Sequence, residues 1–149
     1  RKKGNDLKKD DDYNDQYAQV LFNCFSSNIE PKRVIFDEVA EIHEVACGEE
    51  HSLMLDSKGN IWSCGDNSYG QLGHPVNEKR IDRPKKINSN IKFIDIKTNT
   101  NTNFAIDVDG GLYMWPTLNK MMNVVTIPTK ILTDTSLKVN SIPAVIILF

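Results

Sequence analysis

Residues 44–74 read EVACGEEHSLMLDSKGNIWSCGDNSYGQLGH, and the pattern returns in degraded form at residues 95–116 as DIKTNTNTNFAIDVDGGLYMWP, displaced by 51 positions. In this alignment apolar positions fall on apolar positions and turn residues on turn residues. The aligned pairs are Val45 with Ile96, Leu53 with Phe104, Leu55 with Ile106, Asp56 with Asp107, Gly59 with Gly110, Ile61 with Leu112 and Trp62 with Tyr113. Self-similarity at a fixed period indicates a repeat architecture, in which each unit buries its apolar face against the next.

A second mark of the repeat is a proline followed by basic and apolar residues. It occurs at Pro31, Pro84 and Pro128, at intervals of 53 and 44 residues. The second interval is shorter because the segment after Trp115 lacks a counterpart to residues 67–73. One well-kept unit is therefore followed by an eroded one.

Each unit contains a predicted β-hairpin. Residues 52–55 and 60–63 are short β-favouring runs separated by Asp56-Ser57-Lys58-Gly59, and the second unit has Asp107-Val108-Asp109-Gly110 at the same place. In such a D-x-x-G loop the aspartate accepts from backbone N–H groups two residues on, and the glycine tolerates the positive φ that closes a type I turn with a bulge. The small residues at 46–48 would let backbones approach closely near the axis of a radial structure. The pattern predicts an all-β fold of antiparallel four-stranded blades, as in a β-propeller.

The best-kept unit also carries a long motif. It reads Cys47-Gly48-x-x-His51-Ser52-Leu53, then Asp56-x-x-Gly59, then Trp62-x-Cys64-Gly65-x-Asn67-x-x-Gly70-Gln71-Leu72-Gly73, and it resembles the regulator of chromosome condensation repeat. The match is close over residues 44–87 and weak from there to Ile131. This resemblance implies a seven-bladed β-propeller. The founding member of that family is a guanine nucleotide exchange factor for the small GTPase Ran, bound to chromatin.

The same resemblance implies a set of structural residues that define the repeat. They are Gly48, His51, Asp56, Gly59, Trp62, Gly65, Gly70, Gly73, Asp107, Gly110 and Trp115. The second unit departs from the pattern, since Asn99, Thr102 and Pro116 stand where the first unit has Gly48, His51 and Gly65. Its loops at the blade edge are therefore expected to differ.

A propeller needs about four to eight blades, so this chain of 149 residues is expected to hold only part of one, about two to three blades of an expected seven. The sequence begins at Arg1 without an initiator Met and ends in an apolar run, as a piece of a longer protein would. The expected segments are a disordered charged tail at 1–16, a possible remnant of a preceding repeat at 17–34, the well-kept repeat at 35–87, a degenerate repeat at 88–131 and the start of a further repeat at 132–149.

Charge gives no overall drive toward nucleic acid, because the formal net charge is −2 and the charges are scattered. The tail at 1–16 holds five basic and five acidic residues. It is expected to be a solvated flexible arm, and the alternative is a nuclear localisation or chromatin-contacting tail. The apolar run at 143–149 is too short to span a bilayer, and no secretory signal appears. We expect no membrane association and an intracellular location, nuclear or cytoplasmic.

Three cysteines without C-x-x-C spacing are expected to be reduced thiols. A zinc site formed by Cys47, His51, Cys64 and His74 fits no common ligand spacing, so we expect no bound metal and no other cofactor. A hydrolase centre at His51 and Ser52 is not expected, because neighbours on a strand point to opposite faces. His51 is instead expected to donate to a backbone carbonyl in a blade-to-blade contact.

The loop after the predicted hairpin supplies the candidates for contact with a partner, which are Asp66, Asn67, Tyr69, Gln71 and His74. The alternative for its polar residues is that they tie the loop and the blade together. The run of acidic and basic residues at 78–86 is a second candidate surface. Trp62, Tyr69, Tyr113 and Trp115 could form an aromatic platform, although periodic aromatics in propellers usually pack between blades.

The predicted function is binding, without bond-making chemistry of its own. By resemblance, the leading activity is guanine nucleotide exchange on a small GTPase of the Ran type, with roles in the nucleus and the cell cycle. Chromatin is a further possible partner, and no small-molecule substrate is expected. The alternative is a non-catalytic propeller scaffold within a larger signalling or ubiquitin-ligase protein.

Overall fold

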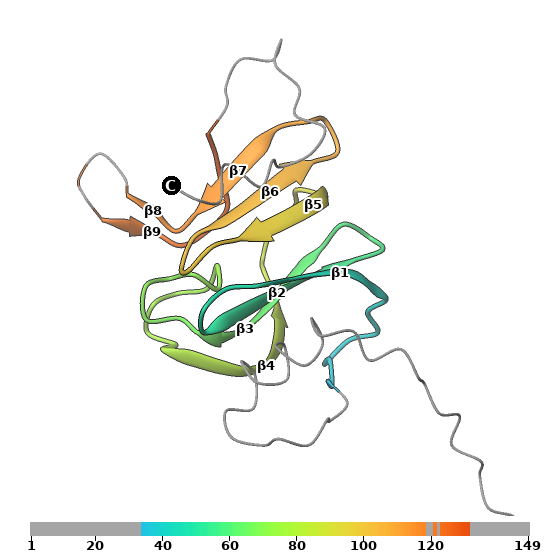
Figure 1. The fold of residues 1–149 in the computed structure, drawn as a ribbon, viewed down its shortest axis with the longest axis horizontal. Coiled ribbons are helices and arrows are strands. Elements are labelled where there is room, and N and C mark those ends of the chain that lie inside the picture. The colour runs from blue at the N-terminus through green and yellow to red at the C-terminus, as the bar shows by residue number, and fades with distance from the viewer. Residues whose placement is uncertain (1–33, 119–120, 122, 132–149) are drawn as a thin grey trace, which may run out of the picture.

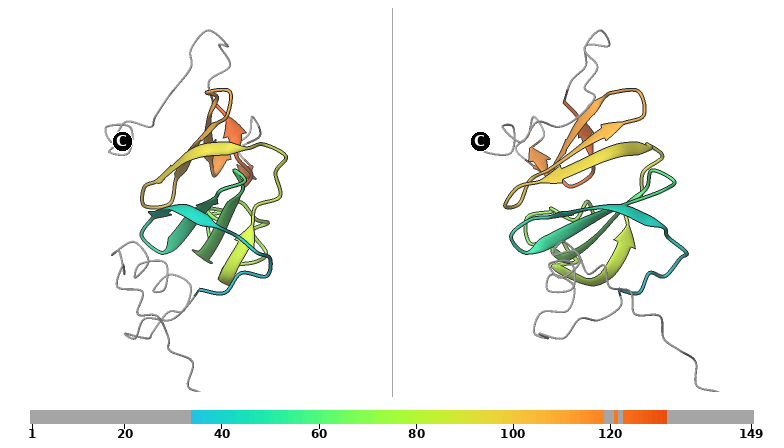
Figure 2. Two further views of the ribbon diagram at one scale, coloured as in Figure 1. Left: turned by 90° about the vertical axis from the view of Figure 1, so that its right-hand side faces the viewer. Right: turned by 45° about the vertical axis from the view of Figure 1, so that its right-hand side comes forward.

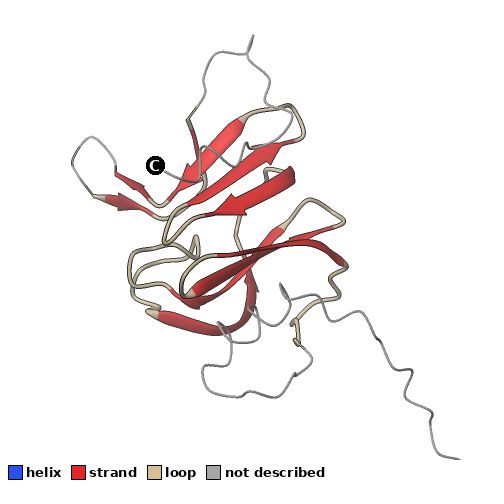
Figure 3. Ribbon diagram, viewed as in Figure 1, coloured by secondary structure: helices blue, strands red, loops and turns tan. Residues whose placement is uncertain are grey.

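The fold is known from a computed structural model that describes residues 34–118, 121 and 123–131. Within those residues all regular structure is β-strand (Figure 3). The strands are β1 (Ile42–Cys47), β2 (His51–Asp56), β3 (Ile61–Asp66), β4 (Arg80–Lys86), β5 (Phe93–Thr98), β6 (Asn103–Asp107), β7 (Leu112–Trp115), β8 (Thr117–Leu118), β9 (Val124–Val125) and β10 (Thr129–Lys130). The expectations for the tail at 1–16, for most of the possible repeat remnant at 17–34 and for the further repeat at 132–149 lie outside the described residues.

Two antiparallel four-stranded sheets form the body of the molecule (Figure 1). Their strand orders are β1-β2-β3-β4 and β10-β7-β6-β5, so each sheet follows the order of the chain from an inner to an outer strand. The second sheet interrupts this path with a two-stranded β8–β9 hairpin before its outer strand β10. These sheets are two blades of a partial β-propeller, which confirms the predicted fold class.

The blades stack face to face, with β1 and β2 of the first lying along β5 of the second (Figure 2). Between them lies the main apolar core. It contains Leu53, Leu55, Ile61 and Ile87 from the first blade and its connection, and Phe93, Ile96, Ala105, Tyr113 and Trp115 from the second. Burial of this core between two sheets supplies the largest stabilising term for such a structure.

The 51-residue repeat fixes which face each side chain takes. Val45, Met54, Trp62 and Cys64 form a cluster on the face of the first blade turned away from the second. Their aligned partners Ile96, Ala105, Tyr113 and Trp115 face the first blade. Leu53, Leu55 and Ile61 face the second blade, and their partners Phe104, Ile106 and Leu112 form a separate cluster beyond it. Successive side chains of a strand point to opposite faces of the sheet. Residues that are aligned in the two repeats therefore lie on corresponding faces of the two blades.

Both D-x-x-G turns have the predicted geometry. The Asp56 carboxylate accepts from the backbone N–H of Lys58 at 2.9 Å and of Asn60 at 2.8 Å. Asp107 accepts in the same way from Asp109 at 2.9 Å and Gly111 at 2.7 Å. The glycines at the fourth position, Gly59 and Gly110, have φ of 77° and 84°. The turn chemistry read from the sequence therefore sets the register of both hairpins.

Gly48 lies at the predicted close approach of the inner strands. A side chain on it would collide with the His51 imidazole and would lie 2.9 Å from the carbonyl oxygen of Asn99 in the second blade. One expectation about the cysteines is wrong. Cys47 is a free thiol, whereas Cys64 is disulfide-bonded, with its partner outside the described residues.

Candidate functional site

A polar bridge between the blades joins the loop after β3 to the inner strands. His51 Nε2 lies 2.7 Å from Asn103 Oδ1 and 3.0 Å from the Thr98 hydroxyl. The Asn103 amide donates to the carbonyl of Gln71 at 2.7 Å. His51, Asn103 and Gln71 are fully buried, so the bonds that Asn103 forms with His51 and Gln71 are shielded from water.

The Asn103 amide also determines the tautomer of His51. Its Nδ2 donates to the carbonyls of Gln71 and Trp115, so its Oδ1 is the acceptor that faces His51. Nε2 of His51 must then carry the proton. Burial lowers the pKa of His51 from its ordinary value of 6.5, against the opposing effects of Asn103 and the Asp66 carboxylate. The contact joins two blades, as expected, but the acceptor is a side-chain amide and not a backbone carbonyl.

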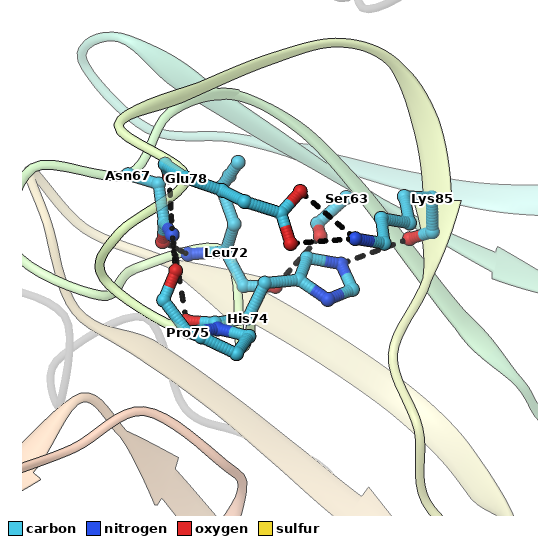
Figure 4. A network of polar contacts seen from close by, with 7 residues as sticks. All are labelled: Ser63, Asn67, Leu72, His74, Pro75, Glu78 and Lys85. Atoms are coloured by element: carbon cyan, nitrogen blue, oxygen red, sulfur yellow. Dashed lines mark hydrogen bonds and ion pairs between the residues drawn. The ribbon is translucent and has the colours of Figure 1, made fainter.

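Asn67 organises the loop between β3 and β4, as Figure 4 shows. Its Nδ2 donates to the carbonyls of Glu78 at 2.8 Å and Pro75 at 3.1 Å, and its Oδ1 accepts from Leu72 N–H at 3.0 Å. A fully buried amide thus replaces the ladder bonds that a loop of this shape cannot make. Asn67 acts inside the protein, so it does not present a contact surface.

His74 and its neighbours attach the same loop to the outer strand (Figure 4). His74 Nε2 lies 3.3 Å from the Lys85 carbonyl, and Ser63 Oγ donates to the Leu72 carbonyl at 2.7 Å. Lys85 forms an ion pair with Glu78 at 2.8 Å. Burial lowers the pKa of His74. His74 is buried, so this candidate too stabilises the loop.

Asp66, Gln71 and Tyr69 form the inner part of the loop. Gln71 Nε2 donates to Asp66 Oδ2 at 2.7 Å, and its Oε1 accepts from Tyr69 N–H at 2.9 Å. Gln71 is fully buried, Asp66 is partly exposed and the Tyr69 side chain is 63% exposed. Of the five predicted contact residues, only Tyr69 and Asp66 are therefore placed to meet a partner.

The β8–β9 hairpin lies against this loop, which the sequence did not predict. A Cβ on Gly70 would lie 2.6 Å from Thr126 Cγ2 and 3.4 Å from Val124 Cγ1. Val124 and Ile127 are 50% and 56% exposed. The contact was missed because residues 117–127 have no counterpart in the first unit, so the repeat alignment gave them no position. Their only signal is the local excess of apolar residues.

The predicted aromatic platform does not assemble. Trp62, Tyr113 and Trp115 are buried, and Tyr69 alone of the four is exposed. The run at 78–86 forms the exposed outer strand and its approach, where Arg80 pairs with Asp82 at 2.9 Å and Lys86 with Glu38 at 2.6 Å. These surface pairs contribute little to stability.

The alternative chemistries have no geometry to support them among the described residues. That part of the chain holds no group of three or more side chains able to bind a metal ion. Ser52 Oγ donates to Cys47 Sγ at 3.8 Å, while His51 contacts the second blade. Nor does any helix of the described residues have the length and apolar character to cross a membrane.

Two family models match the chain, both described as regulator of chromosome condensation (RCC1) repeats. One matches residues 42–71 and the other residues 58–106. Together they include the first blade and the start of the second.

Relatives of known description share the same segment. The human RCC1-like G exchanging factor-like protein is 35% identical over 80 residues, covering 50% of this chain and 17% of the relative. A bifunctional serine/threonine-protein kinase/NEDD4-like E3 ubiquitin-protein ligase of Dictyostelium discoideum is 31% identical over 119 residues, covering 68% of this chain and 6% of the relative. The secretion-regulating guanine nucleotide exchange factor of mouse is 32% identical over 77 residues, covering 51% of this chain. This chain covers 17% of the mouse factor. The chain thus spans less than a fifth of the length of each of these relatives.

Solved structures agree on the fold. Prp20p of Saccharomyces cerevisiae, a structure described with its binding properties to Gsp1p and histones, superposes with a TM-score of 0.62 at 24% identity, over 72% of this chain and 29% of that one. Human WBSCR16 superposes with a TM-score of 0.59 at 25% identity, over 81% of this chain and 34% of that one.

Proposed function

Because the chain carries repeats of the regulator of chromosome condensation family, we propose that it is part of a protein-binding β-propeller and that its leading activity is guanine nucleotide exchange on a small GTPase of the Ran type. The observation that carries this proposal is the loop after β3, whose buried, hydrogen-bonded Asn67 and Gln71 hold an exposed Tyr69. Exchange requires such a rigid surface and no bond-making residues.

The exchange mechanism is differential binding. A partner that prefers the nucleotide-free GTPase lowers the energy of that state and so accelerates loss of the bound nucleotide. The surface must keep its shape when it contacts the GTPase, because ordering a flexible surface would cost free energy of binding. The buried bonds of Asn67 and Gln71 supply that rigidity.

Two relatives support exchange over simple recruitment, because one is described as an RCC1-like G exchanging factor-like protein and the other as a guanine nucleotide exchange factor. The proposed location is intracellular, in the nucleus or the cytoplasm, with chromatin as a second possible partner. The charged residues at 1–16 would then serve as a tail for that contact.

The test is release of a fluorescent guanine nucleotide from a Ran-type GTPase, with and without the full chain. Thermal unfolding of the same sample, followed by circular dichroism, shows whether the blades are folded. Accelerated release by folded protein is the expected result. A cooperative unfolding transition without acceleration would overturn the exchange activity.

A scaffold role is the second candidate, and the relative that combines a kinase with an E3 ubiquitin ligase favours it. In that case the propeller recruits a partner without touching a GTPase. Sequencing the flanking coding region would show whether the repeats continue into a catalytic domain. A chain of about seven repeats alone would count against the scaffold.

A further inference from the structure

One end of the two blades combines apolar and acidic side chains on neighbouring loops. The β1–β2 turn, the loop after β3 and the β8–β9 hairpin all lie at the left-hand end of the blades in Figure 1. Tyr69 belongs to the loop after β3, and Val124 and Ile127 belong to the hairpin and the segment after it. A Cβ placed on Gly70, the residue after Tyr69, would lie 2.6 Å from Thr126 and 3.4 Å from Val124, so the loop after β3 and the end of the hairpin are adjacent.

The inner side of this surface is acidic. Glu49 and Glu50 form the exposed β1–β2 turn. The Glu50 carbonyl accepts from Asp66 N–H at 2.8 Å, and the Glu49 N–H donates to the Thr100 carbonyl at 3.2 Å. These backbone bonds place the turn that carries Glu49 and Glu50 beside Asp66, at the start of the loop that contains Tyr69.

No cation of the described residues forms an ion pair with these carboxylates. The lysines and arginines that are paired there bind Asp82, Glu78, Glu38, Glu44, Asp95 and Asp107. The donors to Asp66 are the neutral groups of Ser68 and Gln71. Lys79 and Arg80 come at the far end of the loop, where the outer strand begins. The surface therefore combines the exposed carboxylates of the β1–β2 turn and Asp66 with exposed apolar side chains, and Lys79 and Arg80 lie at the far end of the loop.

We propose that this surface, formed by Glu49, Glu50, Asp66, Tyr69, Val124 and Ile127, docks a polypeptide segment that carries lysine or arginine beside a large apolar side chain. The inference rests on the proposed role as a protein-binding propeller and specifies the chemistry of the partner. The apolar side chain would pack on Tyr69 and the hairpin, and the cations would lie over Glu49 and Glu50.

The charge arrangement argues against other classes of macromolecule. Nucleic acid phosphates and the anionic headgroups of a membrane would be repelled by three carboxylates on the inner side. A basic segment gains attraction there and faces repulsion from Lys79 only at the outer side. Charge of this kind favours one orientation of the partner and speeds its encounter.

The test is fluorescence anisotropy of a labelled short peptide with Lys-Arg-Lys beside Leu-Phe, titrated with the full chain. A peptide with glutamates in place of the basic residues, and one with alanines in place of Leu-Phe, are the peptide controls. We expect saturable binding of the first peptide only, weakening as salt is raised. Equal binding of the glutamate peptide, or no saturable binding of the first, would overturn the proposal.

Matched variants locate the binding surface. Tyr69→Ala should weaken binding by about fivefold or more, as at a central contact residue, and Glu49→Gln with Glu50→Gln by roughly threefold to tenfold. The controls lie in the Asp107–Gly110 turn at the opposite end of the blades. Val108→Ala removes a side chain that is 61% exposed, close to the 63% of Tyr69, and Asp109→Asn removes an exposed carboxylate. Binding lost equally in the controls would contradict this location.

Failure of the proposal differs from failure of the proposed exchange activity. If the peptide binds and nucleotide release is not accelerated, exchange is wrong and the docking surface stands. If release is accelerated and the peptide does not bind, the docking chemistry is wrong and exchange stands.

Discussion

The two blades hold their central aromatic residue in the same way. The Trp62 ring packs edge-on against Phe36 at 5.3 Å, and the Tyr113 ring packs edge-on against Phe93 at 5.4 Å. Lys86 lies over one ring at 5.5 Å and Lys130 over the other at 5.8 Å. Trp62 Nε1 also donates to the turn aspartate of its own blade, Asp56, at 2.9 Å, and in the second blade burial and the neighbouring Asp107 carboxylate raise the pKa of Tyr113.

The blades differ in the segment between the third and fourth strands. In the first, Asn67 and Gln71 cross-link a loop from within. In the second, the chain passes the cis Trp115–Pro116 bond and forms the β8–β9 hairpin. Interior positions are constrained by packing on both faces, whereas a segment at the end of a blade can vary without disturbing the core. The comparison teaches that the differences between the two repeats are concentrated in these segments, and the docking surface that we propose includes both of them.

The matched aromatics give the largest predicted effect. Trp62→Ala and Tyr113→Ala should each reduce the free energy of unfolding by about 3 to 5 kcal/mol, because both remove a buried ring. Urea unfolding followed by circular dichroism measures it. Tyr69→Ala is the control and should change stability by less than about 0.5 kcal/mol, as an exposed side chain does. A large loss for Tyr113 with none for Trp62 would break the equivalence of the two blades.

The cross-linked loop should lose stability on its own. Asn67→Ala leaves the Leu72 N–H and the Glu78 carbonyl without their partners, which should cost about 2 to 3 kcal/mol. Limited proteolysis should also cut residues 67–79 faster. Ser68→Ala is the control, since its hydroxyl bonds the partly exposed Asp66 carboxylate at the surface. Equal cleavage of the two variants would mean that the loop does not depend on Asn67.

The sequence predicted the parts of this architecture that occur in both repeats. The alignment of Trp62 with Tyr113 and of Asp56 with Asp107 gave the blades, their turns and their alternating faces, because core contacts and turn geometry recur at each period. The β8–β9 hairpin had no second copy to be aligned with. Its position beside Gly70 depends on packing between distant segments, which local pattern does not encode.

The candidate site was predicted only in part, for a related reason. A polar residue in a loop can face a partner or bond its own backbone, and the sequence gives the same signal for both. Asn67, Gln71 and His74 proved to be buried, and Tyr69 is exposed. The bond from His51 to Asn103 was also beyond local pattern, because its acceptor lies 52 residues away.

The smallest predicted effect is the change of stability with pH that arises from His51 in the polar bridge between the blades. Burial lowers the pKa of His51 below its ordinary value of 6.5, and the pKa of His74 is lowered in the same direction. The unfolded chain therefore binds protons at a higher pH than the folded chain does. The stability contributed by the neutral imidazoles is fully present above about pH 6.5 and declines as the pH falls below that value.

His51→Gln separates the bridge from other titrating groups. Glutamine can still donate to Asn103, but it does not titrate and does not replace the fully buried imidazole ring. The variant should therefore be less stable than the parent at pH 7.5. Only the parent loses stability as His51 becomes protonated, so the difference in stability should narrow toward pH 5.5. Urea unfolding of the parent and the variant at several pH values measures this difference directly. His74 and Glu44, whose pKa burial raises, titrate in both proteins, so their effect on stability cancels in the difference. A difference that stays constant across that range would mean that protonation of His51 does not weaken the contact between the blades. The two blades would then be joined mainly by the apolar core around Leu53 and Ile96, and the polar bridge would serve only to position Gln71 and its loop.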